Sequence, residues 1–543
     1  MPIMAKTTYH LARVGNIYLY LQHVKSFGDK IAIIDKVGGV WRKSSYRQLV
    51  DDIYRLTFIL AGKSIKNMNI ALLGGNSYEW LVTYFAIILS GNVVVPLDKE
   101  LSDNEILHLI QYSESKAIFY SKPLAGLIHG NHSQLNSIST FVCFEETDHV
   151  DIKGFTSFEK FINLFKYDDS YEPEPICETE TSVIVFTSGT MGKSKGAMLS
   201  SKNIFSILDA FTDNTCKHKK GVEGLAITAL PLNHTYGLTT ALITMKMGSQ
   251  VAIVDKIANF KKTIEELKPT SLLIVPIFAE SIYKGLMVKL KEQDKLNLVK
   301  RMIRLCKFFL KIGINLRGVL FKQILSQFGG NLGLIVCGGA PLAEEYTQFF
   351  CDIGIKFLNG YGTTECSPLV STNQTTNNKS GSVGLVLSCC NVKVNSMEGE
   401  SEGEIWVQGD NVMLGYYKDP LETEKVFTDG WYKTGDVGRL DKDGFLYITG
   451  RVKNMIVLRN GKNIFPEEIE EKVRLHPDIN EAIVSCTKDE VITLEYYSPK
   501  GEVGDMKDFV KKINDDLPVY AQIGRIKCRD TSFPQTSTRK IKR

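Results

Sequence analysis

Short apolar runs rich in β-branched residues alternate with longer amphipathic stretches over roughly the first 370 residues, and this alternation most constrains the fold. Such runs are typical of strands buried on both faces of a parallel sheet, and the stretches between them are typical of covering helices. The pattern therefore predicts a layered α/β domain. The expected strands are 31–35, 69–74, 93–97, 117–121, 182–187, 251–255, 271–276 and 332–339.

The rest of the chain has a different pattern of predicted secondary structure. From about residue 380, short strands and turns predict a small β-rich subdomain, and the last 90 or so residues read as an α+β unit with helices near 466–476 and 505–517. A chain of 543 residues is also too long for one ordinary core. We expect a large multi-sheet N-terminal domain, 1–450, and a small mobile α+β C-terminal domain, 451–543.

Composition excludes several classes of protein. The net charge of +4 argues against a dedicated nucleic-acid binder. The eleven cysteines are scattered without a C-x-x-C pair, which predicts reduced thiols and a cytoplasmic location. No signal-peptide pattern begins the sequence. The most apolar stretch, 78–97, is interrupted at 90–92, so a buried helix followed by a buried strand explains it better than a membrane span.

Segment 284–322 stands out by charge, with eleven Lys and Arg against two acids. Apolar residues recur in it at three- to four-residue spacing, which predicts a basic amphipathic helix. Two interpretations remain open: a solvated face packed on its own domain, or a peripheral contact with anionic lipid or a polyanionic substrate. The recurring residues are Leu298, Met302, Leu305, Phe309 and Ile312.

A glycine-rich loop follows the expected strand 182–187. A Walker loop needs a glycine five residues before its Gly-Lys-Ser, and Thr187 occupies that position ahead of Gly192 and Lys193. The density of hydroxyls, glycine amides and lysines still indicates phosphate binding. The candidate phosphate-binding residues are Thr187, Ser188, Gly189, Thr190, Gly192, Lys193 and Lys195.

Two later motifs could serve a nucleotide. In "LNGYGTTECSP", 358–368, Tyr361 can stack on a purine, Thr364 can bind a phosphate and Glu365 can bind magnesium. In "WYKTGDVGRL", 431–440, Asp436 can accept hydrogen bonds from ribose hydroxyls. Each motif alone has a plain structural explanation, such as a capped turn.

Together, in this order and spacing, these segments resemble the adenylate-forming superfamily of acyl-CoA synthetases, carrier-protein-loading adenylation domains and firefly luciferase. The resemblance covers about residues 25 to 543. It implies two half-reactions: a carboxylate attacks the α-phosphate of ATP to give an acyl-adenylate, and a thiol then displaces AMP.

The resemblance assigns the nucleotide side of the site. It places the loop 187–195 on the β- and γ-phosphates and Mg²⁺ on Thr187 and Glu365. It places adenine between the backbone at 338–340 and Tyr361, and the ribose on Asp436 and Arg451. The further nucleotide-binding residues that it implies are Gly339, Ala340, Asn359, Gly360, Gly362 and Thr364.

The resemblance also assigns the reacting groups. Lys540 contacts the carboxylate and the α-phosphate, and His234 lines the acyl and thiol channel. Thr364 and Glu365 complete the catalytic set. Lys453 matches the hinge of the C-terminal domain, whose rotation would withdraw Lys540 and bring Gly461 toward the thiol.

The closest resemblance is to the fatty acyl-CoA synthetase branch, which implies a medium- or long-chain acid with ATP, Mg²⁺ and CoA. No aspartate lies near Asn233 and His234 to meet an ammonium group, which disfavours amino-acid activation. Arg539 replaces the usual glycine before the catalytic lysine, and the C-terminal domain is short. A carrier-protein phosphopantetheine therefore remains the alternative acceptor, and a catalytically weakened acyl- or nucleotide-binding regulator is a third hypothesis.

Overall fold

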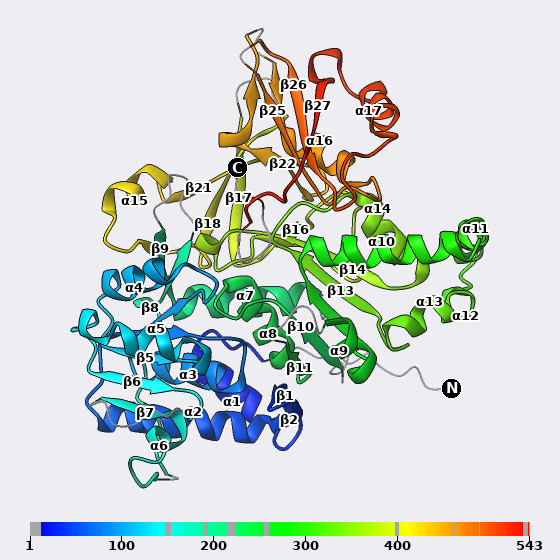
Figure 1. Cartoon of the computed structure of the whole chain (residues 1–543). Coiled ribbons are helices and arrows are strands. Elements are labelled where there is room, and N and C mark those ends of the chain that lie inside the picture. Colours follow the sequence, from blue (N-terminus) through cyan, green and yellow to red (C-terminus); the bar gives the residue numbers. More distant parts are fainter. Residues whose placement is uncertain are drawn as a thin grey trace.

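The computed structural model of the 543-residue chain describes residues 12–146, 154–168, 170–187, 194–215, 224–254, 260–396, 401–459, 462–487, 489–535, 541 and 543. Within these ranges the chain forms two large sheets, one smaller sheet and a C-terminal unit, and the strands of the two large sheets are interleaved along the sequence (Figure 1). No helix in these ranges is long and apolar enough to cross a membrane.

The first large sheet has eight strands in the order β19-β9-β8-β4-β3-β5-β6-β7. Its centre is parallel, and β9 and β19 add antiparallel strands at one edge. The central strands are short and almost wholly buried, as expected for a sheet covered on both faces. The strands are β3 Asn69–Leu73, β4 Val93–Leu97, β5 Ala117–Tyr120, β6 Thr140–Cys143, β7 Phe155–Ser157, β8 Thr181–Thr187, β9 Lys195–Ser200 and β19 Gly415–Tyr416.

The second large sheet has nine strands in the order β16-β15-β14-β13-β12-β10-β11-β1-β2. The run from β1 to β14 is parallel, so the carboxyl ends of β13 and β14 lie at one edge. The strands are β1 Ile31–Val37, β2 Val40–Ser45, β10 Leu225–Thr228, β11 Gln250–Ile253, β12 Ser271–Ile274, β13 Leu334–Gly338, β14 Lys356–Tyr361, β15 Ser371–Thr372 and β16 Leu385–Val386.

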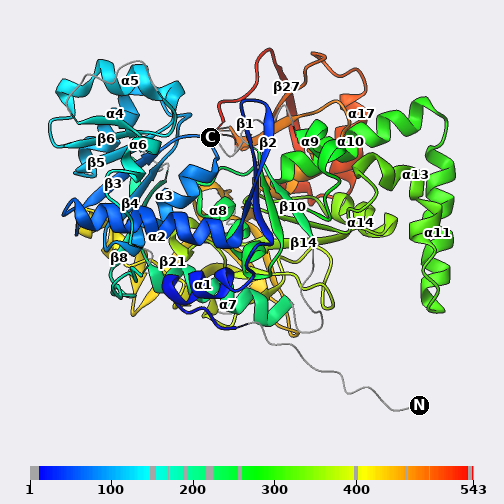
Figure 2. The same ribbon diagram turned by 90° about the horizontal axis from the view of Figure 1, so that it is seen from below.

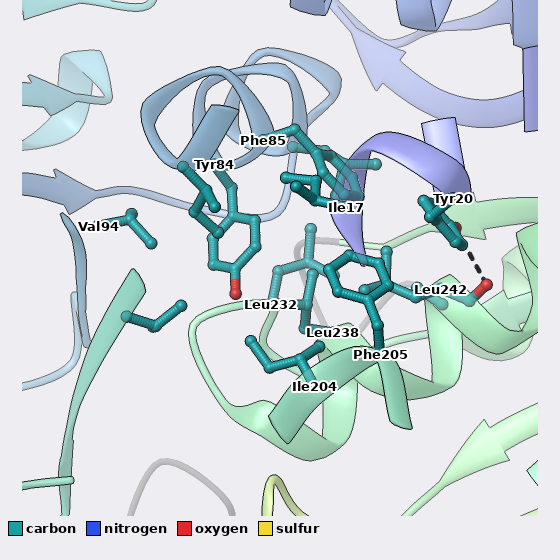
Figure 3. Packing of buried hydrophobic residues seen from close by; sticks show 14 of the residues in the cluster. Ile17, Tyr20, Tyr84, Phe85, Val94, Ile204, Phe205, Leu232, Leu238 and Leu242 are labelled. Atoms are coloured by element: carbon teal, nitrogen blue, oxygen red, sulfur yellow. Dashed lines mark hydrogen bonds between the residues drawn. The ribbon is translucent and has the colours of Figure 1, made fainter. Parts of the chain in front are cut away.

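Helices between the two sheets form the central layer of the molecule. Helix α3 is apolar almost all round, which suits a helix packed on every side. Figure 3 shows the packing, in which Tyr20 stacks on Phe85 and donates a hydrogen bond to the carbonyl oxygen of Leu242 at 3.0 Å. The helices of this core are α1 Ile17–Lys25, α2 Tyr46–Gly62, α3 Tyr78–Leu89, α7 Ser201–Thr215 and α8 Thr235–Lys246.

Two further groups of helices cover the outer faces. One packs on the first sheet and the other on the second, which completes five layers. The first group comprises α4 Asp103–Tyr112 and α5 Ala125–Gly130; α6 Phe158–Ile162 packs near α2. The second comprises α9 Phe260–Leu267, α10 Pro276–Glu292, α11 Leu296–Lys311, α12 Arg317–Leu320, α13 Lys322–Leu325 and α14 Glu344–Ile353.

The β-rich section and the C-terminal unit complete the chain. Strands β17, β18, β20, β21 and β22 form a separate sheet, and β25, β26 and β27 form another with its own apolar core. Figure 2 shows the C-terminal elements beside α10 and α14. The bounds are β17 Cys390–Asn395, β18 Gly403–Gly409, α15 Pro420–Val426, β20 Phe427–Thr428, β21 Trp431–Leu440, β22 Leu446–Arg451, β23 Ile456–Val457, β24 Asn463–Ile464, α16 Pro466–Arg474, β25 Glu481–Cys486, β26 Ile492–Tyr497, α17 Met506–Asp515 and β27 Ile523–Arg529.

The multi-sheet α/β fold is confirmed, and each strand expected in the first 370 residues is present within a few residues of its predicted bounds. Stretch 78–97 is the buried helix α3 followed by β4. Two features differ from the sequence analysis. The glycine-rich loop leads into β9, the antiparallel partner of β8, a strand that the sequence analysis did not predict. The basic segment is not one helix, because the chain turns at Asp294, whose φ is +52°, between α10 and α11.

Candidate active site

Glycines bring the ends of β13 and β14 together. Gly338 lies opposite Gly360 in the parallel register, and a Cβ at Gly338 would lie 3.3 Å from the carbonyl oxygen of Gly360. A Cβ at Gly362 would lie 1.8 Å from the carbonyl oxygen of Pro368, which only glycine permits. Gly338 lets the two predicted adenine-binding segments approach each other, and Gly362 lets segment 358–368 fold back on itself at Pro368.

Three further residues of those segments lie on the same edge. Gly339, with φ +92°, and Ala340 follow β13 and are exposed. Asn359 is half-buried in β14, and its carbonyl oxygen accepts a hydrogen bond from the amide of Asn373 at 2.9 Å. The edge thus presents exposed backbone beside the Tyr361 strand.

Tyr361, Asp436 and Arg451 form one hydrogen-bonded cluster. Asp436 on β21 pairs in register with Arg451 on β22, and the Arg451 Nε donates to its Oδ1 at 2.6 Å. The Tyr361 hydroxyl donates to the other carboxylate oxygen at 2.7 Å. The Asp436 charge raises the pKa of Arg451, and burial raises that of Tyr361. The structure therefore brings together three residues that the sequence separates by up to 90 positions.

The predicted phosphate loop joins β8 to β9. Thr187 and Lys195 face each other at the ends of these strands, and the Thr187 hydroxyl donates to the Lys195 carbonyl oxygen at 3.4 Å. Six of the loop's residues, 188–193, lie outside the described residues. They include the predicted phosphate-binding residues Ser188, Gly189, Thr190, Gly192 and Lys193.

Tyr416 on β19 connects the phosphate hairpin with Glu365. Its hydroxyl donates to the Glu365 Oε1 at 2.9 Å, and the Lys195 ammonium lies 5.2 Å from the centre of its ring. Lys195 also forms a 2.5 Å ion pair with Glu422 on α15; Lys195 and then Lys425 lower the pKa of Glu422 to about 2. Tyr416 and Glu422 were missed by the sequence analysis, because neither belongs to a glycine-rich motif.

The donor chemistry of the site fits magnesium. Glu365 and Thr364 lie in the short turn Thr364–Cys366, and β9 contacts that turn, which places Thr187 and Glu365 in one region. A carboxylate and a hydroxyl are hard oxygen donors, and Mg²⁺ in proteins takes one or two carboxylates with substrate phosphates and waters. Among the described residues, no three His, Cys, Asp or Glu side chains form a metal cluster of their own.

His234 lies at the N-terminus of α8. Its Nε2 is 3.7 Å from an oxygen of Asp98, which follows β4, and the side chain is 29% exposed. The ring therefore sits between the two large sheets, at the end of the central helix layer.

A narrow cavity of about 10 Å³ begins beside this histidine. It lies between the central helices and the first sheet, and no charged residue lines it. Figure 3 shows the Tyr84 hydroxyl directed toward Leu232 and Ile204 in this region. The lining residues are Tyr84, Pro96, Val183, Val185, Leu199, Ile204, Leu232, Asn233, Thr235, Leu238, Thr239 and Ser367.

The C-terminal unit contacts the body through polar groups. Lys453 lies in the turn that follows β22, and burial lowers its pKa. Further on, Lys284 of α10 donates to the Ile479 carbonyl oxygen at 2.6 Å, and Arg474 lies 3.8 Å from Glu280. The predicted reacting residues Lys540 and Gly461 lie outside the described residues.

Comparison with known proteins identifies the family. A family model described as AMP-binding enzyme matches residues 21–417. The chain belongs to this family. The AMP-binding enzyme is 30% identical over 462 residues to long-chain-fatty-acid–CoA ligase 5 of Rattus norvegicus, covering 78% of this chain and 66% of that one.

A second sequence relative and a solved structure support the same assignment. Over 494 residues the enzyme is 27% identical to long-chain-fatty-acid–CoA ligase FadD15 of Mycobacterium bovis, covering 86% of this chain and 79% of that one. The crystal structure of anthranilate CoA ligase AuaEII with anthranoyl-AMP matches with a TM-score of 0.79 at 18% identity, over 98% and 96% of the two chains. The fold is that of the adenylate-forming superfamily, and family and relatives make the protein an AMP-forming acid–thiol ligase.

Proposed function

We propose that this ligase activates a medium- or long-chain fatty acid with ATP and transfers the acyl group to CoA. The uncharged cavity carries the proposal, because it lies between Thr235, the neighbour of His234, and Ser367, two residues from Glu365. Eight of its twelve lining residues are apolar or aromatic. An ammonium group or a second carboxylate would be costly there, whereas an apolar tail would not.

The relatives support the same substrate class, since two of those named above are long-chain fatty-acid ligases. The cavity of about 10 Å³ holds little more than one water, so a bound chain would have to displace side chains such as Leu232 and Leu238.

In the proposed first half-reaction, a carboxylate oxygen of the acid attacks the α-phosphorus of ATP and the bond to the bridging oxygen of the β-phosphate breaks. The loop 187–195 would hold the departing pyrophosphate, and Asp436 with Arg451 would hold the ribose. Magnesium bound at Thr187 and Glu365 would supply charge neutralisation at the phosphates. Lys540 would place a cation on the developing charge.

In the second half-reaction, the thiol sulfur attacks the acyl carbon, the bond to the AMP oxygen breaks, and the thiol loses its proton. A rotation of residues 451–543 at Lys453 would withdraw Lys540 and bring Gly461 toward the thiol. His234 would line the channel used by both substrates. The division at 450/451 is part of this proposal.

Acid-dependent ATP–pyrophosphate exchange tests the proposal. Saturated acids from two to eighteen carbons are compared with aryl acids in the purified protein, and we expect exchange with the longer saturated acids. Tyr84→Ala should shift the preference toward longer or bulkier acids, because it removes a ring that lines the cavity. If none of the acids supported ATP–pyrophosphate exchange, the result would instead support a nucleotide- or acyl-binding regulator.

The acceptor thiol is a separate part of the proposal. Free CoA and a phosphopantetheine carrier protein are offered as alternatives to enzyme that already holds an acyl-adenylate. We expect acyl-CoA as the main product. Transfer to the carrier protein alone would leave the first half-reaction intact and change only the acceptor.

A fatty acid also suggests where this ligase meets its substrate. Long-chain acids partition into bilayers, so we include peripheral membrane contact through segment 284–322 in the proposal. Its support is the exposure of apolar and basic side chains on that segment.

A further inference from the structure

Helix α11 packs against its domain through one narrow stripe. Val299 and Cys306 are buried in the core of the second sheet, and Met302 and Ile303 pack partly against it. Leu298 and Leu305, two of the apolar residues that recur in the sequence of this segment, have exposed side chains instead. The sequence therefore carries a second apolar stripe that the fold does not use.

The second stripe points to solvent. Leu298, Leu305 and Ile312 follow one another at seven-residue steps, which returns each to nearly the same side of a helix. They are 54%, 46% and 60% exposed, and Phe308 beside them is 62% exposed. Ile314 and Val319 extend the exposed apolar surface past the end of the helix. Three large apolar side chains thus lie on one side of α11, together with the exposed Arg301, and Ile312 continues that side just past the end of the helix.

A basic stripe lies next to this apolar one. Lys300, Arg304, Lys307 and Lys311 recur at steps of four, three and four residues, and all are exposed. Lys307 pairs with Asp352 at 2.9 Å. The other three have no ion-pair partner in the described part of the chain, and no acid occurs from 295 to 322.

Helix α11 also has an accessible position. It lies at the periphery of the molecule in both views, beyond α10 and α14 (Figures 1 and 2). Lys284, at the other end of the basic segment, turns inward to the C-terminal unit instead. The outward surface is therefore α11 with the residues that follow it, not the whole segment.

We propose that this two-stripe surface docks on an anionic lipid bilayer, with the apolar stripe of Leu298, Leu305, Phe308 and Ile312 in the headgroup boundary. Exposed apolar side chains beside unpaired cations are the chemistry of an interfacial helix. Each cation near an anionic surface strengthens binding about fivefold. The use of the surface to collect substrate rests on the proposed fatty-acid activity, but the docking itself does not.

Vesicle sedimentation of the full chain tests the docking. Vesicles of phosphatidylcholine alone are compared with vesicles that also contain phosphatidylserine. We expect binding to the anionic vesicles that weakens with salt, because exposed charges are screened. The apolar variant Leu305→Ser/Phe308→Ser and the charge variant Lys300→Gln/Arg304→Gln/Lys311→Gln should each bind at least about tenfold more weakly, as their stripes predict.

Matched controls replace exposed residues elsewhere. Val40→Ser, and Lys261→Gln with Lys262→Gln on α9, should bind as the unaltered protein does. Equal binding by all variants, or no binding to anionic vesicles, would overturn the proposal. So would loss of self-association by the apolar variant without any change in lipid binding. Pyrophosphate exchange with a water-soluble medium-chain acid such as octanoate should be the same in every variant, which separates failure of docking from failure of the proposed function.

Discussion

Two polar clusters of this ligase differ in how completely their charges are paired. In the site cluster, the buried Asp436 carboxylate is held on both oxygens, by Arg451 at 2.6 Å and Tyr361 at 2.7 Å. At the contact between α10 and α16, Arg474 lies 3.8 Å from Glu280, and further carboxylates crowd around it. The first cluster is fully paired, whereas the second gathers several partly buried carboxylates around Arg474 and Lys284 without close hydrogen-bonded pairing of Glu280 among the described residues.

Burial disfavours the charged form of the carboxylates at this contact. It raises the pKa of Glu280 and raises that of Glu471 to about 7, while Arg474, and at Glu280 also Lys284, lower the pKa in part. A contact that holds its carboxylates in an environment unfavourable to their charged form separates more easily than one in which both oxygens of the carboxylate accept hydrogen bonds. The comparison indicates that the Asp436 cluster, which would hold the nucleotide, is the more rigid of the two. The contact between α10 and α16, which would separate when the C-terminal unit turns, is the weaker.

The largest effect is expected for Lys540→Ala, which removes the cation that we propose the turning domain delivers. Adenylation should fall by about 10²–10³-fold, the scale of a preorganised donor to developing charge. Thioester formation from supplied acyl-AMP should be nearly unchanged. Single-turnover assays of each half-reaction make the measurement, and equal loss of both steps would contradict a domain that alternates.

The second-largest effect is expected for Asp436→Asn, which alters the hydrogen-bonded cluster of Tyr361, Asp436 and Arg451. It removes the charge that pairs with Arg451 and would hold the ribose, so the KM for ATP should rise about 10–100-fold, the equivalent of ~1.5–3 kcal/mol for hydrogen bonds to a charged group. Asp443→Asn is the control, because that carboxylate is exposed and pairs with Lys379 away from the site. If both variants keep the KM for ATP of the unaltered enzyme, the site cluster is not the ribose site.

Tyr416→Phe tests whether the well-paired part of the site extends to Glu365, to which the Tyr416 hydroxyl donates. It removes one hydrogen bond to Glu365 at 2.9 Å, and adenylation should fall about 2–10-fold. The magnesium concentration for half-maximal pyrophosphate exchange should rise, since Glu365 loses its orienting partner. Tyr417→Phe is the matched control, because its hydroxyl donates to the Ser113 carbonyl oxygen instead. An unchanged magnesium requirement would exclude this positioning role.

Tyr416 also shows where sequence reasoning ends. The strands, Tyr361 and Asp436 follow from local patterns, since apolar runs and glycine motifs are short-range signals, and Arg451 follows from the family resemblance. Tyr416 reaches the site only because β19 pairs with β9, more than 200 residues earlier, and no local pattern records that pairing. Similarly, periodicity gives α11 two apolar stripes but cannot say that Leu305 faces solvent while Val299 packs.

The smallest expected effect is a pH dependence of the weak contact. The pKa of Glu471 is about 7 against an ordinary 4.5, chiefly because of burial; Arg474 lowers it, and Glu468, Glu280 and Glu345 add smaller increases. Since the docked state holds the proton more tightly, docking loses stability as the pH rises from about 4.5 to about 7 and stays weak above that.

Amide exchange of α10, Pro276–Glu292, corrected for its intrinsic pH dependence, measures this effect. Protection should be a few-fold greater at pH 6 than at pH 8, because opening becomes easier as Glu471 ionises. Glu471→Gln should remove most of the difference, whereas Glu502→Gln, on the exposed surface of the same unit, should keep it. If the Glu471→Gln variant retained the full pH dependence, Glu471 would not be its source, and the other carboxyls here with a raised pKa, Glu280 and Glu468, would be tested next.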